Sequence, residues 1–221
     1  MIRTLIASAA LATGLVGQAG AVTLVWVDNF SQHDQLLETT MPATSTSPLM
    51  SNGLMRTVTL TYASPPPDQD AALAVGPNEE SGQLSVSNEV YSAVGTASWS
   101  LPAAFIPTTG VGVAALKFDV VFSDLDVIAT LKLGASTLGS QTFGGPGTLS
   151  FALDANQNLI NTAGGLLSLV FSGPQQYDMT IDNVRFEISP VPETSTALML
   201  LAGLLATASM RRRMAQASER A

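Results

Sequence analysis

The chain has 221 residues, a formal net charge of −8 and no cysteine. The lack of cysteine excludes disulfides, thiolate metal sites and cysteine nucleophiles. Residues 22–190 hold four basic side chains against fifteen acidic ones, a net charge of −11; such a surface repels phosphate backbones and excludes nucleic-acid binding.

The first 21 residues have the pattern of an export signal. Arg3 provides a positive start, an apolar run covers residues 5–16, and Ala19 and Ala21 flank a glycine in the small-x-small pattern that signal peptidase reads. Three glycines in the stretch disfavour a core helix, since each costs a helix about 1 kcal/mol relative to alanine. We therefore predict a cleaved signal peptide over residues 1–21 and an exported domain over residues 22–189.

Most of the exported domain alternates between apolar and polar residues with a period of two. Turn signals rich in Gly, Pro, Asn and Asp separate the alternating runs, and no window shows convincing helical periodicity. This pattern predicts an all-β domain, an antiparallel β-sandwich of nine or ten strands with a jelly-roll-like arrangement. The clearest runs cover residues 54–63, 82–90, 114–124, 126–134, 148–154, 166–173 and 177–188.

Details of these runs carry further predictions. In residues 54–63, Arg56 shares one face with the apolar Leu54, Val58 and Leu60. In residues 177–188 the apolar face switches near Asp182-Asn183, which indicates a β-bulge. Residues 31–40 are the best helix candidate. The Ser, Thr and Pro of residues 41–53 predict either a long surface loop or a mobile crossing.

The search for catalytic groups gives little. His33 is the only histidine, no G-x-S-x-G elbow occurs, and its polar neighbours predict an exposed loop residue. Asp124 and Asp126 flank one leucine; they are solvated, share a hard cation such as Ca²⁺, or act as an acid pair, in falling order of expectation. Asp182 is a further weak metal candidate. We expect no enzyme and no required cofactor, with calcium as the alternative.

Aromatic and amide side chains are the candidates for sugar contacts. Trp26, Tyr91 and Trp99 offer rings for stacking on sugars, but Trp26 lies in an apolar run that favours core packing. The final strand carries Asp178, Asp182 and Asn183, which form either a solvated outer face or a set of ligands for hydroxyls or calcium.

The C-terminus combines a polar turn, an apolar run and an arginine cluster. The apolar run of residues 196–210 would span about 22 Å as a helix, which is short against a hydrocarbon core of about 30 Å. Arginines after it would stay on the cytoplasmic side. The turn begins with Val191, Pro192, Glu193 and Thr194, and the cluster is Arg211, Arg212 and Arg213.

These ordered parts resemble the C-terminal address of PEP-CTERM proteins of Gram-negative bacteria. Residues 191–196 match the Val-Pro-Glu-Pro-like motif, residues 196–210 the hydrophobic helix and residues 211–213 the arginine cluster; Thr194 departs from the second proline of the motif. The resemblance implies an exosortase as processing partner, a transient inner-membrane intermediate, and a final place at the cell surface or in the extracellular matrix. It covers about 30 residues and implies nothing about the domain ahead of it.

The middle of the chain is also similar to a type of PEP-CTERM ectodomain. The features are an opening "DNFS" segment at residues 28–31, a strand with a central arginine at Arg56, and a closing "IDNVRFEI" at residues 181–188. No activity is implied by this likeness.

Three functions fit the chain. The leading hypothesis is a non-enzymatic exported protein with a structural or interaction role in the matrix. The alternative is a carbohydrate-binding β-sandwich, with calcium assistance as an option. It requires an exposed aromatic or Asp/Asn cluster on one face and an extracellular polysaccharide as partner. A polymer-cleaving enzyme using His33 or the pair Asp124 and Asp126 is the least expected.

Overall fold

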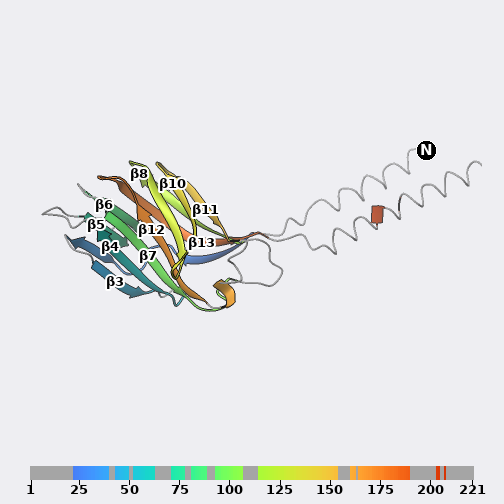
Figure 1. The fold of residues 1–221 in the computed structure, drawn as a ribbon. Helices are drawn as coiled ribbons and strands as arrows, with labels where there is room; N and C mark the ends of the chain where they lie inside the picture. Colours follow the sequence, from blue (N-terminus) through green and yellow to red (C-terminus); the bar gives the residue numbers. More distant parts are fainter. Residues whose placement is uncertain are drawn as a thin grey trace, which may run out of the picture.

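Two antiparallel β-sheets packed face to face make up the domain (Figure 1), as the alternation predicts. The structure is a computed structural model. It describes residues 22–39, 43–49, 52–62, 71–77, 81–88, 93–106, 114–153, 160–162, 164–189, 203, 204 and 207.

Thirteen strands lie in the described residues, where nine or ten were expected. The seven-stranded sheet A has the order β11 (Gly147–Ala152), β8 (Ala114–Ser123), β13 (Asp178–Ile188), β6 (Gln83–Asn88), β5 (Ala71–Gly76) and β2 (Gln35–Thr39), and β1 (Thr23–Asp28) also pairs with β13. The six-stranded sheet B has the order β10 (Ser136–Phe143), β9 (Val127–Leu133), β12 (Gly165–Ser172), β7 (Ala93–Leu101), β4 (Met55–Tyr62) and β3 (Ala43–Pro48).

The core lies between the sheets and follows from the alternation. In β4, Arg56, Val58 and Leu60 are fully buried, so the predicted face is confirmed. An aromatic group fills one part of the core, where the ring of Phe118 lies 5.9 Å from that of Phe171 and 6.3 Å from that of Phe151. Aromatic pairs at these distances add to the stabilisation that burial of their surface provides.

The predicted bulge in β13 is confirmed. The register with β8 shifts between Asp182 and Arg185, and Asn183 has a φ of 58°. Before the bulge Ile181 is buried, and after it Val184 is buried, so the extra residue returns the apolar side chains to the core. The Asp182 carboxylate accepts a hydrogen bond from the Asn183 backbone N–H at 2.6 Å, which supports the left-handed turn.

Two local predictions are wrong. In the described part of this candidate helix, residues 31–39, the structure has no helix. Residues 35–39 form β2, which pairs with β5 and buries Leu37 while Leu36 faces outward. Residues 41–53 contain the edge strand β3 in place of a continuous loop. Its threonines bond across to β4, with Thr46 and Thr57 hydroxyls 3.0 Å apart, and pairing of this kind stabilises a strand with few apolar residues.

The predictions for both termini lie largely outside the described residues. This applies to the cleavage residues Ala19 and Ala21, to the motif of residues 191–194 and to the cluster of residues 211–213. Residues 203, 204 and 207 are helical. In the part of the chain that the structure describes, no helix has the length and apolar character to cross a membrane.

Candidate functional site

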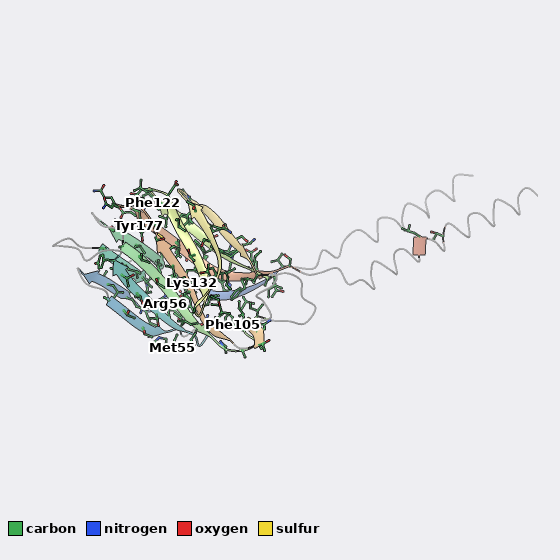
Figure 2. The ribbon with its side chains drawn as sticks, viewed as in Figure 1. Met55, Arg56, Phe105, Phe122, Lys132 and Tyr177 are labelled. Carbon is green, nitrogen blue, oxygen red and sulfur yellow. The ribbon has the colours of Figure 1, made fainter. Side chains whose placement is uncertain are left out.

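A buried ion pair lies between the two sheets. The Arg56 guanidinium, labelled in Figure 2, comes from β4 and has no exposed surface. Its Nη1 lies 3.1 Å from Oδ2 and 3.3 Å from Oδ1 of Asp28 at the end of β1. The same carboxylate accepts hydrogen bonds from the Trp99 indole Nε1 at 2.9 Å and from the Phe30 backbone N–H at 2.8 Å. Both charges are therefore paired and hydrogen-bonded, as burial requires.

The other guanidinium nitrogens hold the segment after β1. Arg56 Nε donates to Gln35 Oε1 at 2.7 Å, and Nη2 donates to the carbonyls of Gln32 and His33 at 2.7 and 2.6 Å. Burial lowers the pKa of Arg56, while Asp28 opposes this change. We name these residues the Arg56 cluster (Asp28, Gln32, His33, Gln35 and Arg56). Because the side chains of Asp28, Gln35 and Arg56 are buried, the cluster fixes the fold and offers no surface to a large ligand.

The three ectodomain-like segments of the sequence meet around this cluster. Asp28 of the "DNFS" segment pairs with Arg56, the central arginine of the second segment. The closing "IDNVRFEI" segment lies in β13, which pairs with β1, and Asp28 is opposite Val184. Segments that are far apart in the sequence are therefore neighbours in the fold.

A second group of charges lies on the outer face of sheet A. Residues opposite one another in antiparallel strands share a face, and Trp26 of β1 is opposite Arg185 of β13, which is opposite Lys117 of β8. On the other side of the bulge in β13, Asp182 is opposite Asp119 of the same neighbouring strand β8. We name this surface the Arg185 face; it consists of Trp26, Lys117, Asp119, Asp182, Arg185 and Glu187.

Ion pairs hold the charged side chains of the Arg185 face in place. Arg185 Nη1 lies 3.0 Å from Asp119 Oδ2, and Arg185 Nε lies 3.1 Å from Glu187 Oε1. Lys117 Nζ lies 2.5 Å from Glu187 Oε2, and the Thr148 hydroxyl donates to Asp119 Oδ1 at 2.8 Å. Trp26 is 46% exposed beside this network. The face therefore presents an open indole ring next to oriented donors and acceptors.

The network shifts the pKa values of its carboxylates. The hydrogen bond from Lys117 lowers the pKa of Glu187, with Arg185 acting in the same direction. Burial tends to raise the pKa of Asp119, but hydrogen bonds from Thr148 and Arg185 outweigh it and lower the pKa. For Asp182, burial raises the pKa, and the charges of Asp119 and Asp28 add to that rise.

These shifts predict an acid-dependent stability. A carboxyl with a lowered folded-state pKa stabilises the fold above its unfolded pKa, and this stability is lost as pH falls through the folded pKa. Glu187 and Asp119 act this way. Asp182 acts in the opposite direction, because its raised folded-state pKa makes its protonated form favour folding.

The Tm profile in acid tests these assignments. We expect the Tm to fall between about pH 5 and about pH 3. Glu187→Gln should flatten this fall and Asp182→Asn should steepen it; parallel Tm profiles for the three proteins would contradict the assignment.

The structure separates the predicted metal candidates. Asp124 and Asp126 are exposed in the turn between β8 and β9, and Asp124 Oδ1 accepts a hydrogen bond from the Asp178 backbone N–H at 2.7 Å. Asp182 lies instead opposite Asp119 within sheet A. Among the described residues, no three histidine or acidic side chains come together as metal ligands. His33 is exposed in a loop, as predicted, and contributes its carbonyl to the Arg56 cluster.

The roles expected of the aromatic residues require one correction. Trp26 was expected in the core, but it is exposed on the outer face of β1, because the alternation in β1 places Val25 and Val27 inward. Trp99 is fully buried, where its N–H is bonded to Asp28. Tyr91 lies outside the described residues. Residues 24–27 are all apolar, so no alternation in the sequence signalled the exposure of Trp26.

The fold and the Arg185 face define a class, an antiparallel β-sandwich with an exposed aromatic residue beside a charged network. No family model and no curated protein matches the chain. Similar solved structures include a Stig cyclase, Fisc, from Fischerella sp. TAU (13% identity, 78% of this chain and 100% of that chain, TM-score 0.36). A second is the family 11 carbohydrate-binding module from Clostridium thermocellum bound to a mixed-linked tetrasaccharide (10% identity, 76% of this chain and 96% of that chain, TM-score 0.33). A third is the CBM22-1 xylan-binding domain of Paenibacillus barcinonensis Xyn10C (12% identity, 80% of this chain and 100% of that chain, TM-score 0.33). The likeness is too distant to transfer the role of any residue.

Proposed function

We propose that this chain is a non-enzymatic exported protein that binds carbohydrate through the Arg185 face of a jelly-roll-like sandwich. The observation that carries the proposal is the exposed Trp26 ring directly opposite Arg185 on the neighbouring strand. Exposed aromatic rings beside a few placed polar groups are typical of ligand-binding surfaces. Calcium assistance stays a prediction.

The chemistry of the face suits a sugar polymer. An indole ring accepts the apolar C–H face of a pyranose, while its edge stays close to polar groups. Arg185 and Lys117 donate to ring and hydroxyl oxygens, and the free lone pairs of Glu187 and Asp119 accept from hydroxyls. Because their ion pairs already hold these side chains, binding sacrifices little side-chain entropy.

The binding proposal is tested with the intact chain and polysaccharide. The protein is run in native gels with and without the exopolysaccharide of the producing cell. Slower migration in the gel that contains the polymer measures retention of the protein by the polymer. Neutral and uronic-acid polysaccharides form the comparison panel. Retention by at least one polymer is the expected result, and absence of retention throughout the panel would leave only a structural role in the matrix.

The proposed route to the matrix uses the two terminal signals. Signal peptidase would act after Ala21, and an exosortase would act near Pro192, where the proline disfavours regular structure and leaves extended chain at the membrane face. The basic residues 211–213 would hold the tail on the cytoplasmic side of the inner membrane until processing. The mature domain would then reach the cell surface or the extracellular matrix of a biofilm.

The terminal signals predict a measurable mass. Protein recovered outside the producing cell is expected to lack residues 1–21 and the region after the Pro192–Thr194 turn, and intact-mass spectrometry reports both losses. Fusing residues 190–221 to an exported reporter should cause membrane retention followed by release, and Glu193→Ala in the fusion should slow the release. A reporter that behaves the same with and without the tail would contradict the sorting function.

A further inference from the structure

The Glu187 carboxylate lies between the two cations of the Arg185 face. Its Oε1 lies 3.1 Å from Arg185 Nε, and its Oε2 lies 2.5 Å from Lys117 Nζ. Arg185 is opposite Lys117 in the register of β13 with β8, so the two cations are neighbours. Glu187 comes two residues after Arg185 in β13 and therefore shares its face. One carboxylate thus bridges both positive charges.

The other contacts of the Arg185 guanidinium also come from the protein. Its Nη1 donates to Asp119 Oδ2 at 3.0 Å and to the carbonyl of Asn183 at 2.9 Å. Together with the bond to Glu187, acceptors in the described residues engage three of the five guanidinium N–H groups. The cation therefore keeps donors for a neutral hydroxyl, while its charge is already matched by two carboxylates.

The charges of the Arg185 face disfavour an anionic ligand. Two cations stand against three carboxylates on this face, and residues 22–190 as a whole have a net charge of −11. A sugar carboxylate would reach both cations only by displacing Glu187, which would then remain beside it. Two carboxylates that share one site repel each other. Hydroxyl groups meet no such repulsion, because they both donate and accept hydrogen bonds.

We infer that Glu187 determines the specificity of the Arg185 face: it occupies the position between Lys117 and Arg185 that a sugar carboxylate would take, and it thereby restricts the face to uncharged polysaccharides. This inference rests on the proposed carbohydrate binding and names its substrate class. A sugar stacked on Trp26 comes within reach of Glu187, because Trp26 is opposite Arg185 and the neighbouring residue pair on the same face is Leu24 and Glu187.

Matched polymers test the specificity with the intact chain. A neutral glucan, a galactan and a mannan are each compared with their own derivative oxidised at C6 to the uronic acid, so that the linkages stay the same and the carboxylate is the difference. Retention in native gels is measured at low ionic strength, where charge effects are largest. The wild type is expected to be retained by at least one neutral polymer and about tenfold or more weakly by its oxidised derivative.

Three variants test whether Glu187 causes the discrimination. The readout is the ratio of retention by the oxidised polymer to retention by its neutral parent. Glu187→Gln frees both cations and should raise this ratio about tenfold. Lys117→Gln/Glu187→Gln also removes one freed cation and should raise it less. Asp126→Asn makes the same change in net charge at an exposed turn and should leave the ratio within about twofold of the wild-type value.

The outcomes separate this inference from the proposed function. Absence of retention by every polymer would contradict carbohydrate binding itself and the inference with it. Oxidised polymers that retain the wild type as strongly as their neutral parents would overturn the inference and leave carbohydrate binding intact. Equal ratios for Glu187→Gln and Asp126→Asn would assign the discrimination to the overall charge of the protein and would overturn the role of Glu187.

Discussion

Replacing Asp28 with alanine is expected to lower the free energy of unfolding by about 3–5 kcal/mol. The substitution leaves the Arg56 guanidinium fully buried without its carboxylate, and a buried charge without a counter-charge is strongly destabilising. It also removes the acceptor of the Phe30 N–H and of the Trp99 indole N–H. Equilibrium unfolding in guanidinium chloride measures the loss.

Two controls distinguish burial of the pair from its charge. Asp119→Ala removes a carboxylate that is 31% exposed in its ion pair with Arg185 and should cost under about 1 kcal/mol. Asp28→Ala/Arg56→Leu removes both buried charges and should be more stable than Asp28→Ala alone. An Asp28→Ala protein as stable as Asp119→Ala would contradict this account of the cluster.

Replacing Trp26 with alanine is expected to weaken retention by polysaccharide about tenfold or more, which corresponds to about 1.4 kcal/mol of binding free energy. The ring is the exposed aromatic surface of the Arg185 face, and a methyl group cannot stack on a pyranose. The Tm should change little, because the side chain is half exposed. Trp26→Phe keeps an aromatic ring and should restore much of the retention.

The matched control is another exposed aromatic residue on sheet A. Phe122 of β8 is 48% exposed, and it lies opposite Thr180, outside the Arg185 face. Phe122→Ala removes similar apolar surface and should leave retention unchanged.

Tryptophan fluorescence gives a second measurement of binding at Trp26. The chain has two tryptophans, so a change in tryptophan fluorescence on polysaccharide binding should vanish in Trp26→Phe, which keeps only the buried Trp99. Equal losses in the Phe122 and Trp26 variants would place binding elsewhere.

Local periodicity accounts for the parts of the fold that the sequence predicts. The bulge in β13 follows from the switch of apolar residues at Asp182-Asn183, and the inward face of β4 follows from the spacing of Val58 and Leu60. The strand β2 was missed because five residues with two leucines in succession fit a helix as well as a strand. Its pairing with β5, which is remote in sequence, decides the structure.

The sites depend on contacts that no local pattern contains. Arg56 was placed on an apolar face, but its partner Asp28 lies 28 positions earlier, and only the packing of the two sheets brings them together. The Arg185 face likewise combines β1, β13 and β8. The spacing of residues in the sequence does not reveal that these three strands are neighbours. The sequence therefore placed Arg56 on an apolar face and named Asp182 and Trp26 as candidates, whereas Lys117, Asp119 and Glu187 became candidates only through the topology.

The position of β13 has a mechanical consequence. Thr23 is opposite Ile188, so the start of β1 and the end of β13 lie side by side. Strand β13 is hydrogen-bonded on one side to β8 and on the other to β6 and β1. If a tail after residue 189 holds the protein while a polymer pulls on Trp26, the tension passes from β1 to the last residues of β13, because Trp26 is opposite Arg185. Hydrogen bonds in an antiparallel sheet lie across the strands, so a pull along the strands would shear the bonds between β1 and β13 together and leave the rest of the sandwich unloaded.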